Sequence, residues 1–379
     1  MRAKIRNTND GAVTQSNESV AKKVFHGRNA DPFMDDKMNG GLAPEQKNMV
    51  EHGDVPFVFM VYNRLHYLNQ TMDSLRQSDF PRESVPVIIS HDGHIPEMVD
   101  YVESLKKHFK IIQLFHPFSC HDHPDTFPGN DERLNEGFKG DKAGNPRTGT
   151  VTCAKHHFAW MLNEVFSLNI TTARGQANHF AFLEEDYVLG PTIYEAIRTG
   201  LSVLDEADKV FPGGLIGLEL DPTLAGARKE QTGLKDQWYT FQFMTGPMTL
   251  SRQIFHQIQE NADTFCSFDD YNWDWSMVKL ANEGKIPSAI LAPARMLAKH
   301  IGVEGMHTEQ LKKIKQKQDS VELVPWVGRG FAKKPVGRRK APGFGGWAHP
   351  VDQEHCRNLF SGKPNVTRLL EFWEEAKQQ

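Results

Sequence analysis

The chain has 379 residues, of which 39% are hydrophobic, and a formal net charge of −4 at pH 7. This length and apolar content suffice for one large domain or two smaller ones, and the near-balanced charge is unlike the basic footprint of a nucleic-acid-binding protein. We therefore expect a small molecule or another protein surface as the partner. No apolar run reaches the roughly 18 residues that span a bilayer, and residues 1–20 lack a signal-peptide core, so the chain is either cytoplasmic or lacks an upstream targeting segment.

The chain changes character at about residue 53. Residues 1–52 are polar without a sustained apolar period, and we interpret them as a flexible stem or lead-in. Residues 55–64, VPFVFMVYNR, form a nearly continuous apolar run, typical of a strand buried on both faces. The apolar spacing that follows predicts a helix over 65–78, a strand over 85–93, a helix over 98–109 and a strand over 110–116.

This alternation of strands and helices predicts a parallel sheet with crossover helices. Ligands in such sheets bind outside the carboxyl ends of the strands, so the polar residues at the ends of the first two strands are site candidates. These residues are Asn63, Arg64, His91 and Asp92.

The middle of the chain contains a Gly- and Pro-rich segment over 117–150, a length typical of a functional or disordered loop. After it we expect, in order, a helix over 153–168, a strand over 179–189 and a helix over 192–210. Shorter apolar runs at 213–220, 238–244 and 247–251 predict a smaller mixed sheet. The region from Pro325 is rich in basic residues, proline and glycine, and the chain contains neither a Walker A loop nor a dinucleotide fingerprint.

An acidic triplet closes the strand expected over 179–189. Because side chains alternate in a strand, Glu184 and Asp186 are predicted to share one side and Glu185 to take the other. Two carboxylates at the carboxyl end of a buried strand suit a hard divalent cation, which takes oxygen ligands. The alternative is a solvated strand end with incidental acids.

Three basic residues, Lys155, His156 and His157, are expected to open the helix that follows the long loop. A helix start with such residues favours an anion through its free N–H groups and dipole. The alternative is a surface helix with one buried histidine. The segment 120–125, CHDHPD, resembles a metal cluster, but it has no partner at a helical or ribbon spacing, so a metal role there is disfavoured. His300 taken alone is read as a structural histidine.

The stretch 264–276, TFCSFDDYNWDWS, places carboxylates, aromatic rings and a thiol together. Asp269 or Asp270 is expected to cap a helix that begins at about Tyr271, which puts Asp270 and Asp274 on one face. Aromatic planes beside a carboxylate are what a sugar site offers, and a carboxylate among them suits a base that stays ionised at neutral pH. The alternative is a buried helix start with capping acids and core tryptophans.

The chain has four cysteines, and none of them forms a CxxC pair, so a zinc ribbon is disfavoured. Their spacing leaves two disulfides and four buried thiols equally open. The cysteines are Cys120, Cys153, Cys266 and Cys356.

TFCSFDDYNWDWS resembles the most characteristic stretch of the N-acetylglucosaminyltransferase II family. Further segments resemble that family in the same order, over about residues 55–356. They are YNRLHYL, MDSLR, SHDG, HPFS, FPGNDER, AKHH, FLEEDY, GMH and GGWAHPVDQEHC.

The resemblance implies a GT-A type glycosyltransferase fold: a mostly parallel sheet flanked by helices, with a smaller mixed sheet. Residues 53–379 are then the catalytic domain, with a nucleotide-sugar half over 53–190 and an acceptor half over 191–379. The implied reaction moves GlcNAc from the donor UDP-GlcNAc to the 2-hydroxyl of the α1,6-arm mannose of an N-glycan on a glycoprotein, with inversion and with Mn²⁺. The resemblance also implies the Golgi lumen, although the membrane anchor of the family is absent from this sequence.

The resemblance also assigns roles to particular residues. It makes Asp186 and His300 the metal ligands, Asp274 the catalytic base, and Cys266 and Cys356 a disulfide pair. That disulfide closes a loop of about 90 residues. The uridine-side positions fall on Asn63, Arg64, Asp92, Lys155, His156 and His157. The acceptor-side positions fall on Tyr271, Asn272 and Trp273.

Some features depart from the family. Cys120 and Cys153 match no family bridge, and the region 213–246 is divergent, which makes the acceptor the least constrained inference. Two alternative functions therefore remain: another β-1,2-GlcNAc transferase of the same fold with a different mannose acceptor, and a non-catalytic carbohydrate-binding homologue.

Overall fold

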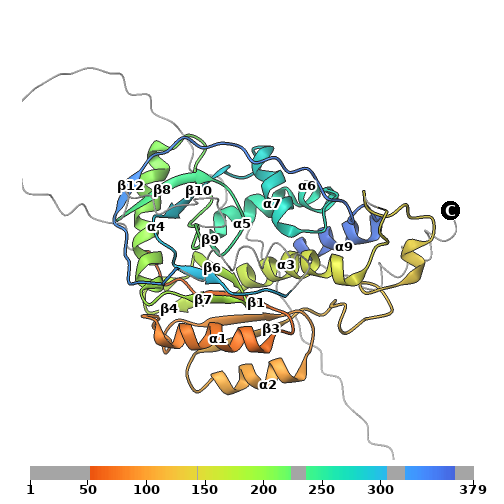
Figure 1. The fold of residues 1–379 in the computed structure, drawn as a ribbon, viewed down its shortest axis with the longest axis horizontal. Coiled ribbons are helices and arrows are strands. Elements are labelled where there is room, and N and C mark those ends of the chain that lie inside the picture. The colour runs from red at the N-terminus through yellow and green to blue at the C-terminus, as the bar shows by residue number, and fades with distance from the viewer. Residues whose placement is uncertain (1–51, 143, 223–235, 305–320, 363–379) are drawn as a thin grey trace, which may run out of the picture. The chain divides into compact units, whose positions relative to one another are not determined.

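The computed structural model describes residues 52–142, 144–222, 236–304 and 321–362 (Figure 1). Residues 1–51 lie outside the described residues, so their interpretation as a stem stays a prediction. The division of residues 53–379 into a nucleotide-sugar half and an acceptor half also stays a prediction. Within the described part of the chain, every helix is too short or too polar to span a bilayer.

The central sheet has five strands in the order β3-β2-β1-β6-β9. Its strands are β1 (Phe57–Val61), β2 (Val87–His91), β3 (Ile111–Phe115), β6 (His179–Glu184) and β9 (Met248–Ser251). The first four are parallel, as the alternation of strands and helices predicts, and β9 runs antiparallel to β6. The run at 247–251 therefore extends the main sheet, and its assignment to a separate smaller sheet is wrong.

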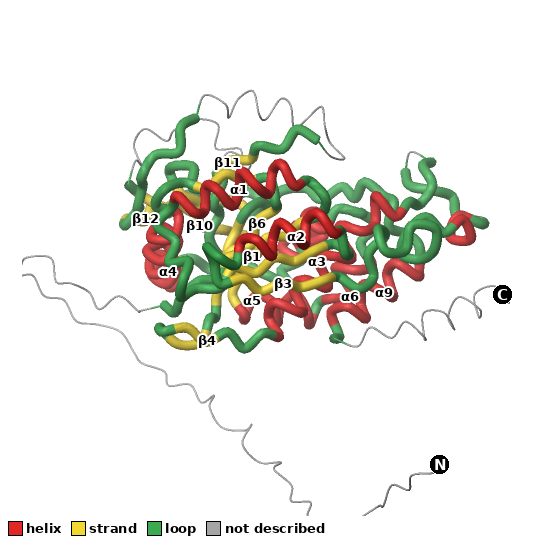
Figure 2. The backbone as a smooth tube through the Cα atoms, turned by 90° about the horizontal axis from the view of Figure 1, so that it is seen from below, coloured by secondary structure: helices red, strands yellow, loops and turns green. Residues whose placement is uncertain are grey.

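Helices cover both faces of this sheet. They include α1 (Leu65–Gln77), α2 (Pro96–Leu105), α3 (Gly149–Ser167), α4 (Ile193–Val210) and α5 (Arg252–Glu260). Along β1, Phe57 and Phe59 enter a core with α1, α2 and α4, whereas Val58 enters a second core with α3 and α5. Because successive side chains of a strand point to opposite faces, one apolar strand supplies both cores. Figure 2 shows α1 and α2 crossing one face of the sheet.

Besides the central sheet and a short hairpin, the described residues form two smaller sheets. The first has the order β10-β8-β12, formed by β8 (Gln237–Gln242), β10 (Ala289–Pro293) and β12 (Gly330–Ala332). It is mixed, because β8 pairs antiparallel with β10 and parallel with β12. The second pairs β7 (Tyr187–Leu189) with β11 (Ala298–His300). The expected α/β fold class, a mostly parallel sheet flanked by helices with a smaller mixed sheet, is confirmed.

The remaining described elements lie in the loops and the C-terminal part. They are the hairpin β4 (Thr171–Thr172) and β5 (Gly175–Gln176), the 3₁₀ helix η1 (Glu132–Asn135), α6 (Ala262–Ser267), α7 (Trp273–Asn282) and α9 (Pro350–Phe360).

Several expected elements differ from the structure. The strand expected over 179–189 breaks in two, because the chain turns between β6 and β7 at Glu185 and Asp186. Helix α3 begins at Gly149, earlier than the expected 153. The run 213–220 makes only isolated bridges, at Leu218 and Glu219.

Candidate active site

The candidate metal ligands Asp186 and His300 are in contact, although they lie far apart in the sequence. Asp186 follows β6, and the antiparallel pairing of β7 with β11 sets His300 opposite Tyr187. The Ile301 N–H donates to the Asp186 carbonyl at 2.9 Å, which fixes the chain just beyond β11. His300 Nε2 consequently lies 3.3 Å from Asp186 Oδ2.

This pair retains unused coordinating atoms. Asp186 Oδ1 and His300 Nδ1 are both buried without a hydrogen-bond partner. Burial raises the pKa of Asp186, but the His300 hydrogen bond and the charge of Arg64 outweigh burial and keep that pKa below its ordinary value. An ionised carboxylate oxygen and an imidazole nitrogen fit a divalent transition metal such as manganese. Within the described residues, no group of three or more acidic, His or Cys side chains forms a complete metal cage, so a metal here needs ligands from a substrate or water.

The loop after β11 packs closely against the Asp186–His300 pair. A Cβ atom added to Gly302 would lie 2.1 Å from Asp186 Oδ2, so only glycine fits there without a shift. Sequence reasoning missed Gly302, because a single glycine in IGVEG carries no signal without the packing.

Arg64 links the ends of β1 and β6. These strands are parallel neighbours, so the residues just beyond their carboxyl ends meet. Arg64 Nη1 donates to Asp186 Oδ2 at 2.8 Å, and its Nε donates to Glu185 Oε1 at 2.5 Å. Glu185 also accepts from the Tyr62 N–H at 2.6 Å. Glu185 is thus a structural partner of Arg64, which places one guanidinium beside the candidate metal ligands.

A pocket connects this acidic end of the sheet with helix α7. Its lining includes Glu184, Tyr187 and Trp273, with Met248 and Phe158 among the apolar residues. The Trp273 ring stacks on Phe158 of α3 at 4.0 Å between centroids. Burial and the charge of Asp186 raise the pKa of Glu184 to about 7. The prediction that Glu184 and Asp186 share a strand face is wrong because the chain turns after Glu184, but the two carboxyls remain electrostatic neighbours.

Asp274 lies in the first turn of α7, directly after Trp273. Its Oδ1 accepts from the Trp275 N–H at 2.7 Å. Arg339, from the segment before α9, holds its guanidinium 4.4 Å from the centroid of the Trp275 ring and interacts electrostatically with Asp274. Asp274 and Trp275 are both partly exposed.

The acids before α7 do not play the expected capping role. The helix begins at Trp273 rather than Tyr271, with Asn272 as its N-cap. Asp270 is buried and accepts from Asn272 N at 2.9 Å and from Phe344 N at 3.0 Å. Asp270 therefore lies outside the helix and does not share a face with Asp274.

On the predicted uridine side, Asn63 is exposed just after β1, whereas Asp92 is buried after β2. The Asp92 carboxylate lies 3.0 Å from His116 Nδ1, and the Ser119 hydroxyl donates to the Asp92 carbonyl at 3.0 Å. Burial alone would raise the pKa of Asp92, but the hydrogen bonds to His116 and Ser119 and the charges of His157 and His116 together outweigh burial and lower that pKa.

Lys155, His156 and His157 are interior residues, so their placement at an anion-binding helix start is wrong. Lys155 Nζ donates to the Phe268 and Asp270 carbonyls at 3.2 and 2.9 Å. Burial holds the pKa of Lys155 well below its usual value. His157 Nε2 lies 2.8 Å from the Ser90 hydroxyl at the end of β2.

His156 belongs to a buried ionic cluster that sequence reasoning missed. Its Nε2 lies 2.8 Å from Asp352 Oδ1 of α9. Arg147 donates to both oxygens of the same carboxylate at 2.8 Å, and also to the Pro128 and Gly129 carbonyls. The only sequence signal for this cluster was the position of Asp352 within the GGWAHPVDQEHC motif. The cluster ties the long loop, α3 and α9 together.

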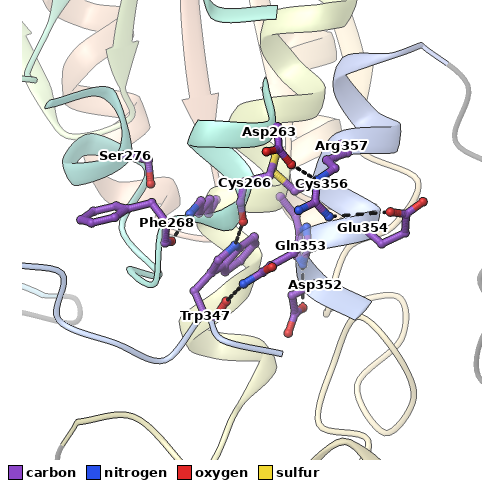
Figure 3. The surroundings of a disulfide bond; sticks show 12 residues. Asp263, Cys266, Phe268, Ser276, Trp347, Asp352, Gln353, Glu354, Cys356 and Arg357 are labelled. Atoms are coloured by element: carbon purple, nitrogen blue, oxygen red, sulfur yellow. Dashed lines mark hydrogen bonds and ion pairs between the residues drawn. A yellow bond between two sulfur atoms is a disulfide. The ribbon is translucent and has the colours of Figure 1, made fainter. Parts of the chain in front are cut away.

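The disulfide between Cys266 and Cys356 is present, and it joins α6 to α9 (Figure 3). Trp347 is fully buried beside it, and its indole Nε1 donates to the Cys266 carbonyl at 2.7 Å. Asp269 accepts from the Trp347 N–H at 3.0 Å. The Cys266–Cys356 disulfide, Asp269 and Trp347 thus together hold the chain that leads into α7. Cys120 and Cys153 are not bridged to each other in this structure.

The CHDHPD segment has a packing role. The His121 ring lies 4.4 Å from the Tyr62 ring, centroid to centroid. Among the residues that the structure describes, this segment forms no metal cluster, and its disfavoured metal role stays a prediction.

Comparisons with known proteins agree with these motifs. The family model described as N-acetylglucosaminyltransferase II (MGAT2) matches residues 28–356. An Arabidopsis thaliana alpha-1,6-mannosyl-glycoprotein 2-beta-N-acetylglucosaminyltransferase is 29% identical over 88% of this chain and 77% of that protein. The Rattus norvegicus protein of the same name is 28% identical over 81% of this chain and 74% of its own length.

Among solved structures, S. aureus TarS 1-349 in complex with UDP-GlcNAc is 11% identical, with a TM-score of 0.37, over 72% of this chain and 68% of that one. This likeness is too weak to decide anything about ligands. The family model, in contrast, spans most of the chain. The protein therefore belongs to the N-acetylglucosaminyltransferase II family.

Proposed function

We propose that this protein transfers GlcNAc from UDP-GlcNAc to the 2-hydroxyl of the α1,6-arm mannose of N-glycans on glycoproteins, with inversion. Family membership supports a GlcNAc transferase, and the names of the plant and rat relatives support this acceptor. The observation that carries the proposal is the 3.3 Å contact between Asp186 and His300, next to a pocket that Glu184 shares with Trp273. The candidate metal ligands and helix α7, which is proposed to face the acceptor, therefore lie near the same pocket.

Asp186 and His300 are the proposed ligands of a divalent cation, Mn²⁺. When bound, such a cation offsets the negative charge that develops on the diphosphate as UDP leaves. The unpartnered Asp186 Oδ1 and His300 Nδ1 support this assignment, because buried polar atoms normally have partners. Arg64 adds a fixed positive charge through its bond to Asp186.

Asp274 is the proposed base. It accepts the proton of the mannose 2-hydroxyl as that oxygen attacks C1 of GlcNAc and the bond from C1 to the phosphate oxygen breaks. Its partial exposure in the first turn of α7, directly after the pocket residue Trp273, supports this role. Tyr271 and Asn272 precede them in the chain and are proposed to line the acceptor side.

The uridine side is proposed to lie at the ends of β1 and β2, where Asn63 is exposed and Asp92 is held by His116. Lys155, His156 and His157 are buried, and among them His157 lies 2.8 Å from Ser90 of β2. We propose that His157 supports the uridine side from the interior and that none of the three residues touches the uridine.

We also propose the Golgi lumen as the location. The Cys266–Cys356 disulfide supports an oxidising compartment, where such bonds persist.

The test is a transfer assay with labelled UDP-GlcNAc on a panel of acceptors, with the linkage of the product determined by NMR. We expect a β-1,2 linkage on the α1,6-arm mannose of a GlcNAc-capped trimannosyl core. In Asp274→Asn, transfer should fall by about 10²–10⁴-fold because general base catalysis is lost, while UDP binding is kept. Asp263→Asn, an exposed acid on α6, is the matched control and should transfer normally.

Transfer to the α1,3 arm or to O-linked mannose would instead identify a different transferase of this fold. Binding of glycan without consumption of UDP-GlcNAc would identify a non-catalytic homologue. Wild-type turnover in Asp274→Asn would remove that residue from the mechanism.

A further inference from the structure

Two free cysteines from distant parts of the sequence lie against each other. Cys120 belongs to the loop after β3, and Cys153 lies in the second turn of α3. Burial raises the pKa of the Cys153 thiol well above its usual value, and the neighbouring Cys120 side chain adds to that rise. Nothing in the family resemblance pairs these cysteines.

Close packing of the loop on α3 produces this contact. A Cβ atom added to Gly149, one turn before Cys153, would lie 3.1 Å from the Cys120 Cβ and 2.7 Å from the Gly129 Cα. The loop therefore approaches the first turn of α3 as closely as a glycine allows. The position of Cys120 is fixed by backbone packing as well as by its own side chain.

The thiol pair lies beside the predicted uridine side. Burial and the two nearby sulfur atoms raise the pKa of Tyr62, at the end of β1, and burial and the charge of Asp92, at the end of β2, raise the pKa of Cys153. The neighbouring His121 ring packs on Tyr62 at 4.4 Å. A bond between the two sulfurs would fasten the loop where it borders the proposed donor site.

The two thiols differ in access. Cys120 is partly exposed, whereas Cys153 is only 3% exposed. An external reagent therefore reaches Cys120 first, and Cys153 is in place to react second. This order is that of an attacking and a resolving thiol in disulfide exchange.

We propose that Cys120 and Cys153 form a second disulfide in an oxidising compartment, by exchange with a small-molecule disulfide such as oxidised glutathione. The Cys120 thiolate attacks that disulfide and releases one glutathione thiol, leaving a mixed disulfide. The Cys153 thiolate then attacks the Cys120 sulfur and releases the second glutathione thiol. The protein loses two protons and two electrons, and the small-molecule disulfide is reduced to two thiols.

The sequence permits a direct test, because trypsin places each of the four cysteines on a different peptide. The folded full-length protein is incubated with oxidised glutathione, alkylated under denaturing conditions and digested without reduction. We expect peptide 111–133 to appear linked to peptide 148–155, with the mass of the sum less two hydrogens. The number of alkylatable thiols falls from two to zero.

Two variants and an internal control make the test decisive. Cys153→Ser should keep glutathione on Cys120, because the resolving thiol is gone, and Cys120→Ser should keep one unreacted thiol. Linkage of peptides 253–279 and 341–357, which carry the Cys266–Cys356 bridge, reports that each sample is folded. The proposal is overturned if wild-type protein that carries the Cys266–Cys356 bridge still has two alkylatable thiols after incubation with oxidised glutathione. It is also overturned if glutathione stays on Cys120 in the wild type, or if Cys120 links to a second copy.

Discussion

The buried cluster of Arg147, Asp352 and His156 gives the sharpest stability prediction. Both members of the Arg147–Asp352 pair are fully buried, and two hydrogen bonds of 2.8 Å join them. Asp352→Asn keeps the shape of the side chain but leaves the guanidinium without a counter-charge. Breaking a buried pair in this way costs about 3–5 kcal/mol of unfolding free energy.

The pH dependence of this effect follows from the pKa of Asp352. Burial opposes ionisation, but the charge of Arg147 and its hydrogen bonds hold the pKa of Asp352 far below its usual range. A depressed carboxyl pKa contributes stability that is fully present above the unfolded value, about 3.9, and is lost as the pH falls below it. The difference between wild type and Asp352→Asn should therefore be constant from about pH 5 to 8 and shrink in stronger acid.

The assay is urea unfolding at pH 7, followed by tryptophan fluorescence and circular dichroism, whose agreement checks two-state behaviour. Glu354→Gln on the same helix is the matched control, because its pair with Arg357 is partly exposed and 3.7 Å long. It should cost less than about 1 kcal/mol. A similar small cost for Asp352→Asn would refute the reasoning.

Replacing Cys266 and Cys356 together by alanine should lower the unfolding free energy by roughly 4–5 kcal/mol in urea unfolding, since the bridge closes a loop with a sequence separation of 90; a loss below about 1 kcal/mol would contradict this. Gly302→Ala should displace the Asp186 carboxylate and weaken Mn²⁺-dependent UDP binding by at least about tenfold in calorimetry, because its Cβ would lie 2.1 Å from Oδ2; unchanged affinity would show that the loop yields freely. Burial lowers the pKa of His91 to about 4, so its contribution to stability is fully present above about 6.5 and falls as the pH drops toward 4. Between pH 7.5 and 5, the unfolding free energy of His91→Gln in urea should therefore fall by about 2 kcal/mol less than that of the wild type. Equal falls in the two proteins would refute the lowered pKa of His91.

Apolar pattern predicted the framework of the fold well. The runs that became β1, β2 and β3 are short and apolar, and the helices between them show helical spacing, so local sequence and tertiary burial agree. The start of α3 was misplaced because GTVT, at 149–152, has no helical signal of its own. The four-residue strand β9 was misassigned because its partner β6 lies far away in the chain.

The site was less accessible to pattern alone. The contact between Asp186 and His300 depends on the pairing of β7 with β11, and the sequences of these short strands do not predict that pairing. Only the family resemblance predicted that the two residues act together. Lys155 reads as a surface charge, yet two backbone carbonyls and the face of Trp347, 4.3 Å from Nζ, accommodate it in the interior. Charge in a sequence does not reveal such partners.

Calorimetric titration of UDP with and without Mn²⁺, on wild type and His300→Gln, tests the central claim most directly. The wild type should bind UDP more tightly with Mn²⁺, and EDTA should remove the gain. His300→Gln should lose at least tenfold of that gain and keep its metal-free affinity, whereas His179→Gln, a histidine of β6 outside the site, should behave like wild type. Full Mn²⁺-dependent UDP binding in a folded His300→Gln would contradict the account.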